Sequence, residues 1–178
     1  MNKNKCIEFY FDCSSPWTYL AFKEILPLSQ RQNIEIIWKP ILVGGVFNSV
    51  NQDVYAFRKK PNSLKLQYAS NDMDLWAKLR QVNISVPKIF PVNSVKPMRG
   101  CLFALQKNCL PLFAQKVFEA YWERGLDISD ETILANIAEE AGLLPQDFKQ
   151  YIYSQEAKDL LISNSSQLIE KKGFGSPT

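Results

Sequence analysis

The stretch that decides the fold is Ile7-Glu8-Phe9-Tyr10-Phe11, followed after three residues by Ser15-Pro16-Trp17-Thr18. The alternation in the first run is typical of a half-buried strand. Pro16 suits the first position of a helix, because its missing N–H would have no partner there. Ser15 is then the helix cap, and the N–H groups and positive dipole end of the helix favour a negative charge beside its hydroxyl. The alternative is an ordinary N-cap, which contributes roughly 1 kcal/mol to stability.

Composition excludes several classes of function. The 178 residues include 46% hydrophobic ones, enough for one domain or one domain with a large insertion. The net charge is +3, without the basic and aromatic interleaving of a nucleic-acid groove, so we expect no nucleic-acid partner. Histidine is absent, which removes the commonest general base, the commonest transition-metal ligand and any Ser-His-Asp triad. The four cysteines form neither a CxxC pair nor a zinc spacing, so we expect reduced thiols and no metal site.

The N-terminal residues 1–5 lack the apolar region of a signal peptide, and no apolar stretch approaches the ~20 residues that cross a bilayer. We therefore expect a cytoplasmic protein with no membrane partner.

The opening forty residues are typical of a β-α-β unit, because alternating residues 34–39 follow the helix that begins at Pro16. A right-handed crossover makes the two strands parallel. We expect Pro27 to kink or interrupt the helix, and the helix to end by Asn33. Residues 41–47, with two glycines, are predicted to form a turn. Helical periodicity then predicts these spans: Leu64–Val82, Lys96–Asn108, Leu112–Arg124, Glu131–Ala141, Gln146–Tyr153 and Glu156–Lys172.

These elements divide the chain into three parts. Residues 1–46 form an N-terminal β-α-β segment, residues 47–172 a helical insertion domain, and residues 173–178 the start of a C-terminal segment. Two strands alone make a marginal sheet, and two glycines and a proline at the end of the chain precede the place where another strand belongs. We therefore expect the chain to be truncated.

Four short motifs carry a resemblance to a known family. They are Asp12-Cys13-Ser14-Ser15-Pro16-Trp17-Thr18-Tyr19-Leu20-Ala21, Trp38-Lys39-Pro40, Phe90-Pro91-Val92-Asn93-Ser94-Val95-Lys96-Pro97-Met98-Arg99 and Gly173-Phe174-Gly175-Ser176-Pro177-Thr178. Together they resemble the 2-hydroxychromene-2-carboxylate isomerases, which are grouped with the kappa-class glutathione transferases and are similar to DsbA. The resemblance implies an α/β, thioredoxin-like fold of the DsbA/kappa type with a large all-helical insertion. It also implies a homodimer, and that the C-terminal strands of the thioredoxin fold are missing here.

The resemblance also implies site residues. Ser15 lies where the isomerases and kappa transferases carry the serine that contacts the glutathione sulfur. Thr18 lies where the disulfide enzymes carry their second cysteine, so a local dithiol is excluded. Asn51 and Lys65 look like the family's glutathione-contacting asparagine and lysine, and without the resemblance they would be a turn residue and an exposed helix residue.

At the C-terminus, Pro177 looks like the cis-proline of the thioredoxin fold. The resemblance implies that Ser176 presents backbone groups that pair with the tripeptide like an added strand. A trans proline that ends a loop is the alternative, which X-Pro base rates favour without the motif.

The function implied is a glutathione-dependent isomerase, in which Ser15 stabilises the glutathione thiolate that adds reversibly to a conjugated aromatic substrate. A kappa-like transferase, which conjugates glutathione to an electrophile, would use the same site. A third hypothesis is a catalytically inactive binding or assembly protein. Cys13 is either a reactive thiol near the same helix terminus or, as we favour, a small hydrophobic residue at the end of a strand.

Overall fold

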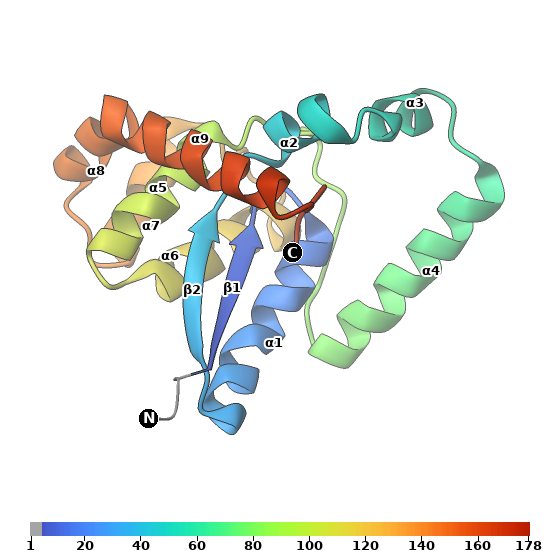
Figure 1. The fold of residues 1–178 in the computed structure, drawn as a ribbon, viewed down its shortest axis with the longest axis horizontal. Coiled ribbons are helices and arrows are strands. Elements are labelled where there is room, and N and C mark those ends of the chain that lie inside the picture. The colour runs from blue at the N-terminus through green and yellow to red at the C-terminus, as the bar shows by residue number, and fades with distance from the viewer. Residues whose placement is uncertain (1–4) are drawn as a thin grey trace.

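The structure is a computed structural model that describes residues 5–178. Strand β1 (Cys6–Phe11), helix α1 (Pro16–Gln32) and strand β2 (Glu35–Pro40) open the chain (Figure 1). The two strands pair in parallel, with Cys6 opposite Glu35 and Phe11 opposite Pro40. The predicted β-α-β unit is confirmed.

Helix α1 begins and ends as its sequence predicts. Ser15 has extended backbone angles and accepts a hydrogen bond from the N–H of Thr18, and Asn33 closes the helix in the left-handed region, with φ of 50°. Of the kink or interruption predicted at Pro27, the interruption is wrong, because α1 continues through it. Pro27 lies on the exposed side of α1, where water can pair with the carbonyl that the proline leaves free.

Helices follow from residue 43 to residue 170. Their bounds are α2 (Val43–Val50), α3 (Asp53–Lys59), α4 (Ser63–Arg80), α5 (Val95–Gln106), α6 (Leu110–Phe118), the π-helical turn η1 (Glu119–Glu123), α7 (Glu131–Glu140), α8 (Pro145–Ile152) and α9 (Gln155–Glu170). Each predicted span agrees with a helical segment to within two residues at either end. The span predicted from Leu112 combines α6 with η1.

The turn predicted over residues 41–47 is wrong, because α2 already begins at Val43. The buried carboxylate of Asp12 accepts a hydrogen bond from the N–H of Val43 at 2.9 Å and so satisfies a donor at the start of the helix. Val46 is fully buried in the same helix. This tertiary cap and this packing outweigh the low helix propensity of Gly44 and Gly45.

The two faces of the sheet are covered by different helices. Phe11 on one face contacts Phe22 of α1, with ring centroids 6.5 Å apart. Tyr10 on the other face belongs to a buried cluster with Ile41 and Leu168 of α9. This alternation follows from the two-residue period of a strand. Helix α1 begins close to the carboxyl end of β1.

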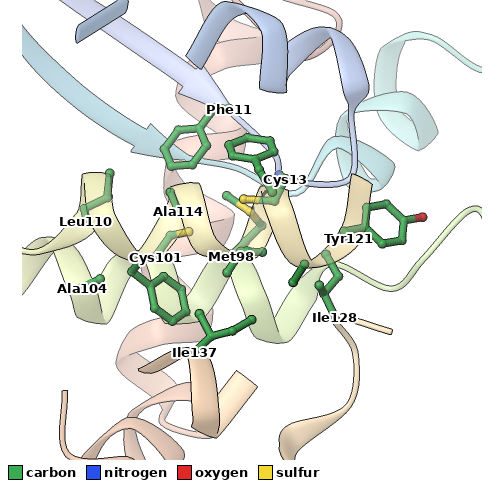
Figure 2. Packing of buried hydrophobic residues seen from close by; sticks show 14 of the residues in the cluster. Phe11, Cys13, Met98, Cys101, Ala104, Leu110, Ala114, Tyr121, Ile128 and Ile137 are labelled. Atoms are coloured by element: carbon green, nitrogen blue, oxygen red, sulfur yellow. Dashed lines mark hydrogen bonds between the residues drawn. The ribbon is translucent and has the colours of Figure 1, made fainter. Parts of the chain in front are cut away.

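One hydrophobic core joins the sheet to the helices. Figure 2 shows Phe11 and Cys13 together with Met98 and Cys101 of α5 and Ala114 of α6, all of them fully buried. The three-part division of the chain stays a prediction, and its boundary at residue 46 falls inside α2.

Helices α3 and α4 project from this body as an arm (Figure 1). The arm is attached near the end of α4, where Arg80 forms an ion pair with Glu24 of α1 at 2.8 Å and Ala77 is buried. Within residues 5–178, no helix is both long enough and apolar enough to cross a membrane.

Candidate active site

The C-terminal loop meets the start of α1. The Oγ of Ser15, a half-buried residue, donates a hydrogen bond to the carbonyl oxygen of Ser176 at 3.1 Å and accepts one from the N–H of Thr18 at 3.3 Å. The hydroxyls of Thr18 and Ser176 pair at 2.7 Å. We call these three residues, with Pro177, the serine junction. It places the hydroxyl of a half-buried serine at the positive end of a helix dipole.

The segment that carries Ser176 runs along β1. The Ser176–Pro177 peptide bond is cis. The Oγ of Ser176 accepts a hydrogen bond from the N–H of Asp12 at 2.9 Å. Tyr10 and Thr178 exchange two backbone hydrogen bonds of 2.9 and 3.1 Å, the pattern of an antiparallel pair, on the edge of β1 that β2 does not occupy. Among residues 5–178, no acceptor pairs with the N–H of Ser176.

Asp12 is a site-forming residue to which the sequence analysis gave no role. Its fully buried carboxylate accepts hydrogen bonds from the N–H groups of Ser14 and Val43, both at 2.9 Å, and from the hydroxyl of Ser94 at 2.8 Å. Burial raises the pKa of Asp12, and these hydrogen bonds oppose that rise. Asp12 therefore ties the end of β1 to the start of α2 and to the residue before α5. The sequence feature that could have indicated this role is the position of Asp12, an acidic residue directly after the apolar run that ends at Phe11.

Asn51 and Lys65 occupy different surroundings. The side-chain amide of Asn51, at the end of α2, donates a hydrogen bond to the carbonyl oxygen of Phe174 at 3.1 Å. It therefore holds the loop that leads to Ser176. Lys65 is exposed in the first turn of α4. That end of α4 lies away from α1 in Figure 1. Within the chain as described, Lys65 does not join the serine junction.

An aromatic rim with one cation lies beside the loop before Ser176. A ring carbon of Phe47 lies 3.9 Å from the position a Cβ would take at Gly175. The guanidinium carbon of Arg58 stands 5.9 Å from the ring centroid of Phe47 and 5.7 Å from that of Phe90. Phe90 in turn packs edge-on against Trp122 at 6.0 Å. The rim offers apolar surface and a positive charge.

Cys13 faces away from this rim into the core. Its N–H donates to the sulfur of Met98 at 3.3 Å, and its carbonyl accepts from the indole N–H of Trp122 at 2.9 Å. Burial, together with the neighbouring Cys101, raises the pKa of the Cys13 thiol well above its usual value. A thiol in that state is a packing group rather than a nucleophile. Among residues 5–178, no group of three or more histidine, cysteine or acidic side chains could hold a metal ion.

The sequence profile of the DSBA-like thioredoxin domain matches residues 6–178. The chain belongs to the DSBA-like thioredoxin family. The solved structure of a 2-hydroxychromene-2-carboxylate isomerase superposes with a TM-score of 0.79 at 26% identity, covering 97% of this chain and 83% of that one. The expected thioredoxin-like fold of the DsbA/kappa type is thereby confirmed.

Relatives within the DSBA-like family carry two kinds of name. The 2-hydroxychromene-2-carboxylate isomerase of Pseudomonas putida is 28% identical over 97% of this chain and 83% of its own length. Glutathione S-transferase kappa 1 of Rattus norvegicus is 26% identical over 94% of this chain and 72% of its own length. The resemblance read from the sequence motifs is confirmed, and both groups of relatives are enzymes.

Proposed function

We propose that this DSBA-like protein is a glutathione-dependent isomerase of the 2-hydroxychromene-2-carboxylate isomerase type. The observation that carries the proposal is the serine junction, where the Ser15 hydroxyl caps α1 beside the cis Ser176–Pro177 bond. Positions 15 and 18 hold hydroxyl side chains, so the reactive sulfur comes from a bound thiol. The names of the relatives support glutathione as that thiol and an isomerase or a transferase as the activity.

The proposed mechanism begins with an exchange of hydrogen bonds. The Ser15 hydroxyl has one proton, which it donates to the carbonyl of Ser176. When glutathione binds, its cysteine N–H takes that carbonyl as its acceptor, and the unpaired N–H of Ser176 meets a carbonyl of the tripeptide. This is the addition of a short strand to a free edge. The Ser15 hydroxyl keeps its proton and turns its hydrogen bond to the sulfur, and the proton of the glutathione thiol leaves to solvent.

The sulfur is stabilised as a thiolate by that hydrogen bond and by the N-terminus of α1. Lowering the thiol pKa from ~8.5 to near neutrality takes about 2 kcal/mol of preferential anion stabilisation. A hydrogen bond to a charged group and a helix terminus together supply that amount. The thiolate then adds to a conjugated aromatic substrate, rotation occurs about the former double bond, and the thiolate leaves, as in covalent catalysis with a borrowed nucleophile.

The remaining glutathione contacts in this proposal come from Asn51, Lys65, Ser176 and Pro177. Asn51 and Ser176 already lie on or against the C-terminal loop. Lys65 stands on the arm, so its contact with glutathione requires the arm to lie against a bound tripeptide.

We also propose that the protein is a homodimer joined through the outer face of α4. Leu64, Tyr68, Leu75 and Leu79 are 64% to 76% exposed, and their spacing of four and seven residues puts them on one face of the helix. That face is opposite the side that holds Ala77 against α1. A second copy of the same stripe would bury it in an isologous interface. Sedimentation of a Leu75→Glu, Leu79→Glu variant tests this: persistence of the dimer refutes the assignment.

A kappa-like glutathione transferase is the second candidate, because its relatives match over a similar share of the chain. The mass of the product separates the two activities, since isomerisation leaves the substrate mass unchanged and transfer adds one glutathione. Titration calorimetry with glutathione tests the shared premise. Absence of binding refutes both enzymes and favours a non-catalytic assembly protein. The cytoplasm is the proposed location, because glutathione and free cysteines both persist in a reducing compartment.

A further inference from the structure

A cavity lies between α2, α5 and α9, apart from the serine junction. Its volume is about 310 Å³, and none of the residues of the serine junction lines it. Its walls are largely apolar, with contributions from Leu42, Leu161, Ile162 and Ile169. The size and the apolar lining are those of a site for a small organic molecule.

The charged groups of this cavity have one sign. Arg99 of α5 and Lys158 of α9 line it, and no acidic residue does. Within residues 5–178, neither cation forms an ion pair with a carboxylate. The cavity therefore combines apolar walls with two cations that lack an anionic partner.

Arg99 has hydrogen-bonding capacity that the protein does not use. One of its terminal nitrogens donates to the carbonyl of Ile152 at 2.9 Å. Its Nε is buried and has no acceptor among the described residues. A buried donor without a partner is costly. Because Nε is closed to solvent, a carboxylate would pair with the terminal nitrogens of the guanidinium, which have the geometry to meet both of its oxygens.

We propose that this cavity binds a small carboxylate with an apolar body, of the class that includes aromatic acids. The carboxylate would pair with the Arg99 guanidinium, with Lys158 as a second, more exposed cation. The apolar body would pack between the leucine and isoleucine side chains of α2 and α9. A highly charged anion such as a nucleotide fits less well, because the walls would leave its polar surface unpaired.

The cavity also touches the element that supports the serine junction. The Oγ of Ser165 on α9 accepts a hydrogen bond from the N–H of Leu42 at 3.1 Å. The next residue, Val43, is the one held by Asp12. A bound carboxylate would therefore contact the start of α2, and we expect slower amide hydrogen exchange in that helix.

Titration calorimetry with 1-naphthoate tests the proposal, with neutral 1-naphthalenemethanol as the matched probe without charge. We expect the acid to bind far more tightly than the alcohol. Arg99→Gln should weaken naphthoate binding by about tenfold or more, and Lys158→Gln less. Lys78→Gln, an exposed lysine on the arm, is the matched control and should change nothing.

Because Arg99→Gln also removes the bond to Ile152, a second variant protects the test from a folding defect. Gly45 lines the cavity, and a Cβ added there meets only Leu42 at ordinary contact distance. Gly45→Leu should therefore fill the cavity and leave the protein folded.

Several results would each overturn the proposal. They are no naphthoate binding to the natural protein, equal binding of acid and alcohol, and naphthoate binding that survives both Arg99→Gln and Gly45→Leu. Displacement of naphthoate by glutathione, or its loss in Ser15→Ala, would place it at the serine junction and would also overturn the proposal.

Discussion

Replacing Ser15 with alanine separates the structural from the chemical role of its hydroxyl. The hydroxyl caps α1 through Thr18 and donates to the carbonyl of Ser176. Loss of an N-cap costs about 0.5–2 kcal/mol of stability. A hydrogen bond to a charged group contributes about 1.5–3 kcal/mol. At 1.36 kcal/mol for each pKa unit, the thiol of bound glutathione should therefore gain about 1–2 units in pKa in the variant.

The assay is the ultraviolet thiolate absorbance of bound glutathione as a function of pH. At neutral pH the variant should hold about tenfold less thiolate, and turnover should fall by a similar factor. Ser154→Ala is the matched control, because Ser154 caps α9 with the same geometry, accepting from the N–H of Ala157 at 3.1 Å, and is far along the chain from Ser15. It should lose similar stability and leave the thiol pKa unchanged. An unaltered thiol pKa in Ser15→Ala would refute the role assigned to that hydroxyl.

Three other substitutions or reactions test the fold around the site. Asp12→Asn should lower the free energy of unfolding by about 1–3 kcal/mol, since an amide nitrogen replaces one acceptor oxygen. Burial raises the pKa of Asp12 above 3.8, so its ionisation costs stability as pH rises past that value. The stability advantage of the natural protein over Asp12→Asn, measured by urea unfolding, should therefore shrink with rising pH, and growth would contradict this. Gly100→Ala should also destabilise, because the new Cβ would lie 2.8 Å from the buried ring of Phe113, and overpacking costs about 1–3 kcal/mol; an unchanged melting temperature would argue against such tight packing. In native protein an alkylating reagent should label exposed Cys6 and spare buried Cys13 until unfolding, and early labelling of Cys13 by mass mapping would reverse its assignment to the core.

Local signals allowed much of the fold to be predicted. Ser15 and Pro16, which are neighbours in the sequence, fix the start of α1. Such caps act between neighbours, so they are visible in a single sequence. The start of α2 was missed because its cap, Asp12, lies 31 residues upstream. The glycines and valines around Val43 do not show that its N–H group has an acceptor so far away in the sequence.

The candidate site was predictable in part for the same reason. The Ser15 hydroxyl could be placed at a helix terminus from its neighbours alone. The hydrogen bond from Asn51 to Phe174 spans 123 residues, and the role of Asp12 depends on partners from two other elements. Lys65 was assigned from the family resemblance, and the arm on which it stands could not be inferred from helical periodicity.

The contact between Ser15 and Ser176 joins residues 161 positions apart in the chain. Closing so long a loop is entropically costly, and folding slows as contacts become less local. The intervening helices must therefore collapse before the two serines meet. During refolding, recovery of thiol binding should lag behind the return of the helical circular dichroism signal. Thiol binding would then report that the chain between the two serines has finished folding.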